Sequence, residues 1–322
     1  MDKELQTPKK DYFFSVSVLA SAIIIAGALI YSTGSKTNNT ESVAGLSLTQ
    51  TSEIEEGVLP SRGVVLPVRW GDLGSKLVGT GVIDAEQFKA IYDQRGAFSE
   101  EYESLLFGQN NGNLPAGEAG LKITNDNAGY LLNLFWALGL ANENPILESG
   151  EMTNPRYGGA QNFASTGGWT IADGDPMSHY SQHQFFTLTL EQQALVDKVS
   201  RGIYRPCCGN STHFPDCNHG MAMLGLLELM ASQGISEQKM WETALAVNSY
   251  WFPDAYLAIA QYFESRGISW EKVNPKEILG AAYSSASGYQ KIMEQVKSRP
   301  NQGGGGCSVE PAPAKTSGGC EV

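Results

Sequence analysis

Three of the five cysteines and two of the four histidines lie in one short segment, RPCCGNSTHFPDCNHG, which runs from residue 205 to 220. Thiols and imidazoles are the side chains that proteins most often use to bind zinc and copper. The sequence therefore predicts a metal or redox centre in this segment. It indicates the position of the site more clearly than the function of the protein.

The spacing of this cluster suggests which residues act together. Cys207 and Cys208 are adjacent, Cys217 follows after a short loop, and His219 lies two positions further on. We expect Asn218 to cap the next helix, which would place Cys217 and His219 at a helix N-terminus, where a thiolate is stabilised. The predicted ligands are Cys207, Cys208, Cys217 and His219, with zinc or copper as the ion.

The remaining histidines are weaker candidates for the same site. His179 and His183 form an H-x3-H pair whose rings would share one face of a helix, and His213 lies inside the cysteine segment. Met221 and Met223 follow closely, and a Cys/His/Met environment would suit copper, although core packing on an apolar helix is the better explanation of these methionines.

Several other interpretations stay open. Cys207 and Cys217 could form a structural disulfide, with Cys208 buried as a small apolar side chain. His179 and His183 could be hydrogen-bonded residues with no ligand role. A Cys–His hydrolase is a weaker alternative, because no orienting motif accompanies Cys217 and His219.

The cluster resembles two known motifs. Its arrangement is similar to the CxC…CxH pattern of SWIM-type zinc motifs, and its position before a helix that ends in a glycine turn resembles the membrane-anchored PCYCGC-motif proteins. Both resemblances are short and the spacing differs from each, so we transfer no family's residues to this chain.

An uncharged N-terminal segment predicts a membrane anchor. Residues 13–31 contain no charged side chain, and as a helix they would span roughly 28 Å, close to the thickness of a bilayer core. Lys9 and Lys10 precede this segment, which places the N-terminus in the cytoplasm by the positive-inside rule. A cleaved signal peptide is the alternative. We expect localisation at the cell membrane, with the main domain extracytoplasmic.

Composition divides the chain into four parts. We predict a cytoplasmic stub and transmembrane anchor at 1–32, a flexible stalk at 33–57, a globular domain carrying the Cys/His cluster at 58–299, and a Gly/Pro-rich tail at 300–322. The tail carries Cys307 and Cys320, whose thiols could exchange metal or disulfides with the main cluster.

The predicted fold is mainly α, with long ordered loops, a few short strands and a helical C-terminal half. Residues 63–70 read as a strand or an extended arm, and residues 150–174 as an ordered loop. Helical patterns occur at 84–92, 127–140, 218–232, 236–251, 253–266 and 275–298.

Charge and motifs narrow the function. The net charge of -12, without a basic cluster, argues against a nucleic-acid partner. No glycine pattern has the context of a nucleotide-binding loop. The leading hypothesis is a membrane-anchored extracytoplasmic metal-binding protein. The alternatives are a thiol-disulfide redox protein and a surface interaction domain with a structural metal or disulfide. The sequence identifies no catalytic residue and no protein partner.

Overall fold

Helices make up most of the structure, a computed structural model that describes residues 48–95, 99–108 and 120–297. In the described part of the chain the strands are short: β1 (Val64–Val65) pairs antiparallel with β2 (Lys122–Ile123), so that Val64 lies opposite Ile123. The prediction of a mainly α fold with few short strands is confirmed.

The helices of the N-terminal half are α2 (Leu48–Val58), α3 (Leu73–Gly79), α4 (Ala85–Arg95), α5 (Glu100–Phe107), α6 (Ala128–Ala141) and α7 (Pro145–Ser149). The later ones are α8 (Leu190–Gly202), α9 (Asn218–Ser232), α10 (Glu237–Trp251), α11 (Pro253–Glu264), α12 (Pro275–Ile278), α13 (Ala281–Ser284) and α14 (Ala286–Lys297). The loop between α7 and α8 contains the short 3-10 turns η1 to η4.

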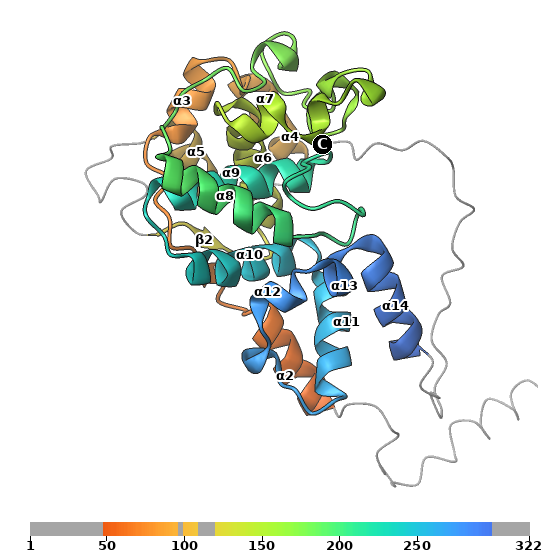
Figure 1. Ribbon diagram of the computed structural model, residues 1–322. Helices are drawn as coiled ribbons and strands as arrows, with labels where there is room; N and C mark the ends of the chain where they lie inside the picture. Colours follow the sequence, from red (N-terminus) through yellow and green to blue (C-terminus); the bar gives the residue numbers. More distant parts are fainter. Residues whose placement is uncertain (1–47, 96–98, 109–119, 298–322) are drawn as a thin grey trace, which may run out of the picture. The chain divides into compact units, whose positions relative to one another are not determined.

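The centre of the core is the contact between α6 and α9. Both helices are buried almost all round, and α9 also packs against α8 (Figure 1). Their backbones approach closely at Gly139 and Gly225: a Cβ on Gly139 would lie 2.2 Å from the carbonyl oxygen of Met221. Because glycine has no Cβ, this sequence allows two apolar helices to pack backbone against backbone.

Side-chain caps fix several helix starts. The Asp84 carboxylate accepts hydrogen bonds from the backbone N–H groups of Glu86 and Gln87, as the sequence predicts for the start of α4. Ser236 accepts from the backbone N–H of Lys239 at the start of α10. The predicted helices at α4, α6, α9, α10 and α11 are all present.

The last predicted helix is wrong as one continuous element. Residues 275–298 instead contain α12, α13 and α14. The Ser284 hydroxyl donates to the Ile278 carbonyl and the Ser285 hydroxyl to the Ala281 carbonyl, so both side chains compete with the helical pattern at the breaks. The amphipathic α3, α5 and α8 were not predicted.

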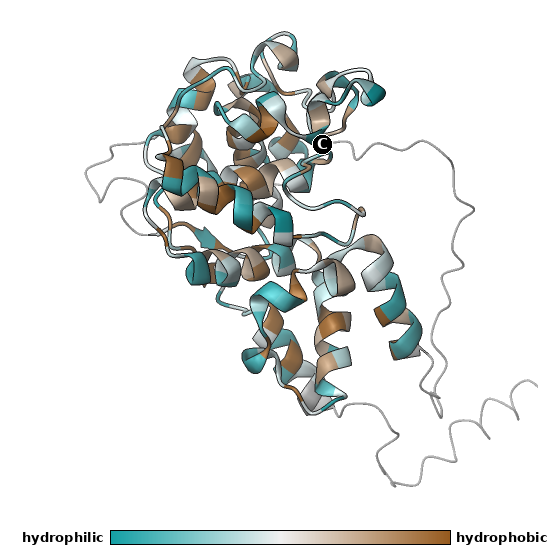
Figure 2. Ribbon diagram, viewed as in Figure 1, coloured by the Kyte–Doolittle hydropathy of each residue, from teal (hydrophilic) through white to brown (hydrophobic). Residues whose placement is uncertain are grey.

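Helix α2 occupies residues that composition assigned to a flexible stalk. Its side chains Ile54 and Val58 are buried, and the helix packs against α11 and the 3-10 turn η5 (Trp270–Lys272). Apolar residues on α2 and α11 appear as brown bands among paler and teal ones in Figure 2. Ile54 and Val58 are four residues apart and therefore share one helix face, which allows both to be buried.

Within the described ranges, no helix has both the length and the apolar character needed to cross a membrane. The predicted anchor at 13–31 and the tail with Cys307 and Cys320 lie outside the described residues.

Candidate metal centre

A folded-back loop brings the three central cysteines together. The loop between α8 and α9 begins at Ile203, and its two sides are joined by the bridge between Tyr204 and Ser211 and by the hydrogen bond from Thr212 N–H to the Ile203 carbonyl, 2.7 Å. The chain then returns to the start of α9 at Cys217. Residues that are separated along the chain therefore meet at one helix N-terminus.

The sulfur atoms of Cys207, Cys208 and Cys217 all lie within 4.8 Å of one another. The Sγ atoms of Cys207 and Cys217 are 3.7 Å apart. All three cysteines are free thiols; Cys207 is exposed, Cys208 is half-buried and Cys217 is buried. The structure thus forms one compact group of three sulfur donors that is open to solvent on the Cys207 side.

This separation fits a tetrahedral metal ion. Zinc binds thiolate sulfur at about 2.3 Å, which places two sulfurs of one tetrahedral shell about 3.8 Å apart. The Cys207–Cys217 separation of 3.7 Å is close to this value, and the Cys208 sulfur lies within 4.8 Å of both. The group could therefore hold a metal ion without large rearrangement of the loop.

A buried arginine organises the cysteines. Arg205 is 1% exposed, and its Nε donates to the sulfur of Cys217 at 3.1 Å. Its other guanidinium nitrogens donate to the Phe214 carbonyl at 3.1 Å, the Asn210 carbonyl at 3.2 Å and the Asp216 carboxylate at 2.5 Å. One planar side chain therefore ties together both sides of the loop and the start of α9.

The environment stabilises a thiolate on Cys217. Hydrogen bonds from Cys207 and Cys208 hold the pKa of Cys217 well below its usual value against the opposing effect of burial, and the Arg205 charge and His219 contribute in the same direction. The pKa of Cys207 is raised, first by its hydrogen bonds with Cys208 and Cys217 and then by burial.

Cys208 behaves like Cys207. Its hydrogen bond with Cys207 lowers the pKa, but the hydrogen bond with Cys217 and burial outweigh this effect and raise the pKa of Cys208 to about 11. Without a metal, the lowered pKa of Cys217 and the raised pKa values of Cys207 and Cys208 favour a negative charge on Cys217 over the other two sulfurs.

His219 lies beside the group without joining it. The three cysteines form the compact group, and no nitrogen of His219 belongs to it. Its ring packs against Phe252, with centroids 4.4 Å apart, and against Trp251. Its Nδ1 is buried and has no hydrogen-bond partner in the described part of the chain. The N-cap position belongs to Cys217, so the prediction of Asn218 as the cap is off by one residue.

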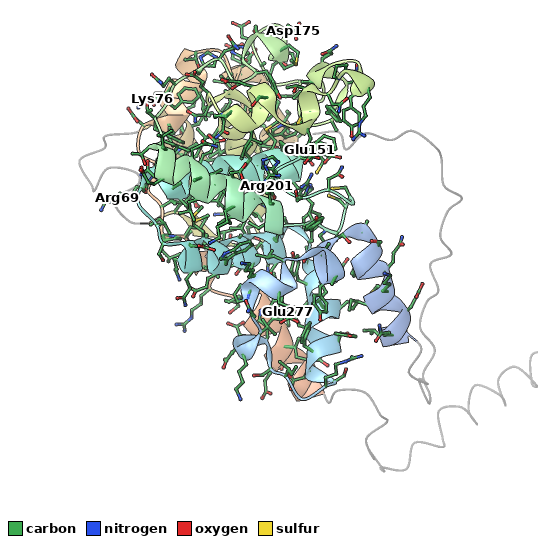
Figure 3. The ribbon with its side chains drawn as sticks, in the orientation of Figure 1. Arg69, Lys76, Glu151, Asp175, Arg201 and Glu277 are labelled. Carbon is green, nitrogen blue, oxygen red and sulfur yellow. The ribbon has the colours of Figure 1, made fainter. Side chains whose placement is uncertain are left out.

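His213 takes part in a separate group of charged residues. Its Nε2 lies 2.8 Å from the Asp197 carboxylate, and its Nδ1 lies 3.8 Å from Glu151. Arg201 pairs with the same aspartate at 3.0 Å, and Figure 3 labels Glu151 and Arg201 in this region. The contact with Asp197 accounts for Nε2, whereas Nδ1 is buried and has no hydrogen-bond partner among the described residues.

His179 and His183 form a pair away from the cysteine group. His179 Nδ1 lies 2.9 Å from His183 Nε2. The predicted helix that would bring them together is absent, because the chain forms the 3-10 turn η4 (Pro176–Ser178) and then a turn through Ser181. Met221 and Met223 are buried in the core of α9, as core packing requires.

Arg205 is the site residue that sequence reasoning missed. It lies next to Pro206 in the printed segment, and a single arginine beside a cysteine pair has no distinguishing spacing. Tyr256 is a second case, because it is fully buried near Cys207. Burial raises the pKa of its hydroxyl against the opposing hydrogen bonds with Ser284 and Asn248, and Cys207 adds a smaller rise. Only the tertiary structure reveals either neighbour.

Comparison with protein-family models, with curated proteins and with solved structures finds no match for this chain.

Proposed function

We propose that this chain is a membrane-anchored extracytoplasmic metal-binding protein, whose zinc or copper ion is held by Cys207, Cys208 and Cys217. The observation that carries the proposal is the convergence of three free thiols within 4.8 Å of one another. Thiolate sulfur is the donor that selects zinc and copper(I) over hard cations. An ion bound there replaces the thiol protons that the sulfurs otherwise share.

Charge balance supports a divalent ion more strongly than a monovalent one. Three thiolates carry three negative charges, and the buried guanidinium of Arg205 offsets part of this charge at 3.1 Å from Cys217. The Asp216 carboxylate, which pairs with Arg205, adds one negative charge to the same environment. A divalent ion leaves less net charge in this half-buried site, and uncompensated buried charge is costly.

His219 is our proposed fourth ligand. It lies two residues after Cys217, in the first turn of α9, and its buried Nδ1 has no hydrogen-bond partner among the described residues. A buried polar atom without a partner costs free energy, so a rotation of this ring toward an ion would satisfy it. The exposed side of Cys207 leaves the ion accessible to an external thiol acceptor, which suits metal handling.

Membrane anchoring is the part of the proposal that rests on sequence alone. The uncharged stretch 13–31 and the preceding lysines support it. A full-length chain should sediment with membranes and resist extraction by carbonate, whereas a chain without residues 1–32 should be released. Release of the full-length chain by carbonate would contradict the anchor and leave the metal site untouched.

A thiol-disulfide redox function is the second candidate. The supporting observation is an exposed thiol, Cys207, only 3.7 Å from Cys217, whose pKa is depressed. The Cys217 thiolate would attack an external disulfide, form a mixed disulfide and release one partner thiolate. Cys207 would then pass its proton to that thiolate and attack the Cys217 sulfur, which forms the Cys207–Cys217 disulfide and releases the second partner thiolate. In this mechanism Cys208 has no required role.

Cys208 therefore separates the two candidates. If the group binds metal, Cys208→Ser and Cys217→Ser should both lower zinc affinity, by at least about tenfold, in protein purified reduced and metal-replete. If the group is a redox pair, Cys208→Ser should leave disulfide formation intact while Cys217→Ser abolishes it. Metal analysis with thiol counting measures both, and Cys307→Ser/Cys320→Ser serves as the matched control outside the group.

A further inference from the structure

The side chains of His179 and His183 are joined by a direct hydrogen bond, and a shared ion would replace it. His179 Nδ1 and His183 Nε2 are 2.9 Å apart, and the two rings are inclined by only 23°. Two imidazoles on one zinc or copper ion, each at 2.0–2.1 Å in tetrahedral geometry, have nitrogens about 3.3 Å apart. The observed separation is shorter, and with the ring centroids 5.2 Å apart the two nitrogens point directly at each other. Binding an ion therefore requires both rings to rotate away from their mutual hydrogen bond.

The backbone between the two histidines is held firmly. The N–H of His183 donates to the Ala141 carbonyl at 2.9 Å, its carbonyl accepts from the N–H of Glu143 at 2.8 Å, and the N–H of Ser181 donates to the Leu140 carbonyl at 2.8 Å. This segment is therefore fixed to the C-terminal end of α6. A site that is attached to a helix end retains its geometry without a bound ion.

Ser181 adopts a left-handed conformation, with φ of 53°, and it is the one non-glycine residue with positive φ in the described part of the chain. Its hydroxyl accepts from the backbone N–H of Asn144 at 3.0 Å, which helps to hold the conformation in place. Such conformations cost free energy and occur most often at functional sites. The turn through Ser181 allows both rings to meet without a helix.

The second nitrogen of His179 is oriented as in known metal ligands. His179 Nε2 lies 3.5 Å from the backbone carbonyl of Asp173, so a proton on Nε2 points toward that oxygen and leaves the Nδ1 lone pair directed at His183. Histidines that bind metals almost always donate their other ring N–H to a carbonyl or carboxylate. His183 is partly exposed, which gives an ion a route to the pair.

We propose that His179 and His183 form a second metal site, separate from the cysteine group, for a divalent ion of the zinc and copper class. Water completes the coordination, because no third His, Cys, Asp or Glu ligand atom lies within the same short range in the described part of the chain. On binding, the His183 proton moves from Nε2 to Nδ1 through solvent, so two neutral imidazoles present their lone pairs to the ion.

The two sites lie at different places along α9. His183 forms a bridge with Asn142, and Asn142 donates to Glu228 at 2.7 Å. The rise along α9 from Cys217 to Glu228 is about 16 Å. Ions at the two sites would therefore not share a ligand.

Copper(II) binding to a full-length chain with all five cysteines replaced by serine tests the second site alone. We expect one copper ion whose paramagnetic resonance spectrum shows splitting by two imidazole nitrogens. His179→Ala and His183→Ala should each weaken binding at least about tenfold. His213→Ala is the matched control, because Asp197 already binds its Nε2, and it should leave affinity unchanged. A folded cysteine-free chain without nitrogen-bound copper, or equal affinity in His183→Ala, would overturn the proposal.

A second measurement uses the native cysteines and does not depend on how the serine variant folds. In equilibrium dialysis against zinc, the wild-type chain should bind one equivalent more than His183→Ala and the same amount as His213→Ala. Equal zinc content in the wild type and His183→Ala overturns the second site. A failure of the cysteine site would lower the zinc content of all three proteins equally, so the two proposals fail in distinguishable ways.

Discussion

At the scale of single residues, Arg205 decides whether the cysteine loop stays closed. Arg205→Lys keeps the charge but loses the planar set of donors, so the carbonyls of Asn210 and Phe214 lose their hydrogen bonds from the guanidinium. The Phe214 carbonyl still accepts from the N–H of Asp216 at 2.9 Å. A hydrogen bond to a charged group contributes about 1.5–3 kcal/mol, so we expect the metal-free reduced protein to lose about 2 kcal/mol or more. Urea unfolding measures this change, and zinc affinity should fall with it.

The matched control is Arg201→Lys. Arg201 makes a comparable ion pair with Asp197 at 3.0 Å, but its side chain is 55% exposed. Exposed ion pairs contribute little, so this variant should change the free energy of unfolding by less than about 0.5 kcal/mol. Equal losses in the two variants would show that Arg205 is not the organising residue of the loop.

Glu228 makes stability depend on pH. It is fully buried, and burial raises its pKa well above the usual value against the opposing hydrogen bonds from Asn142, at 2.7 Å, and Asn144. In the unfolded chain a glutamate has a pKa of about 4.3. Its contribution to stability is therefore complete below this pH and is lost as pH rises, by up to about 1.4 kcal/mol per unit.

We therefore expect the wild type to lose more stability between pH 5 and pH 8 than Glu228→Gln, whose side chain does not ionise. Urea unfolding at both pH values measures the difference. Glu242→Gln on α10 is the control, because the pKa of that exposed carboxylate is lowered by Lys239 and it is ionised at both pH values. The same pH dependence in the wild type and Glu228→Gln would contradict this account.

At the scale of helices, the contact between α6 and α9 has no space for a side chain at Gly225. A Cβ there would lie 2.4 Å from the Phe135 carbonyl oxygen and 2.6 Å from the Gly139 nitrogen, both of them backbone atoms. Gly225→Ala should therefore destabilise the protein by about 1–3 kcal/mol, although alanine favours a helix. Gly129→Ala, on α6 with no atom nearby, should be neutral or stabilising by up to about 1 kcal/mol. Thermal unfolding compares the two.

Helices were predictable where local signals coincide. Asp84 and Ser236 mark helix starts through caps that act within one turn, and the apolar run of α6 requires burial whatever its neighbours are. The breaks at Ser284 and Ser285 were not predictable. They depend on which backbone carbonyl each serine hydroxyl binds, and this is decided by the folded structure.

In the candidate sites, too, features set by residues close in sequence were predictable, and features set by tertiary contacts were not. Cys207, Cys208 and Cys217 are close in sequence, so a short loop is sufficient to bring them together. The role of Arg205 depends on its burial and on four partners along the returning loop, which spacing does not encode. The pairing of His179 with His183 was expected from helical geometry, yet the structure achieves it through the left-handed turn at Ser181.

At the scale of the whole molecule, the boundary of the folded domain lies before α2. Composition places the start of the domain at residue 58, but Ile54 and Val58 are buried against the C-terminal half, and the Tyr250 hydroxyl donates to the Pro60 carbonyl at 2.8 Å. We therefore expect a fragment of residues 46–297 to be more stable than one of residues 58–297, by about 1–3 kcal/mol from the apolar burial that α2 adds. Guanidinium unfolding of the two fragments measures the difference.

A substitution inside α2 isolates the cause of that difference. Ile54→Ala in the longer fragment should remove most of the gain, because it deletes the largest buried side chain of the helix, whereas Glu55→Ala, on the exposed face, should keep it. Equal stability of the two fragments would show that α2 is an appendage of the domain. The expected result would instead make residues 48–58 a structural part of the domain, and it would shorten the segment between the predicted anchor and the fold to residues 33–47.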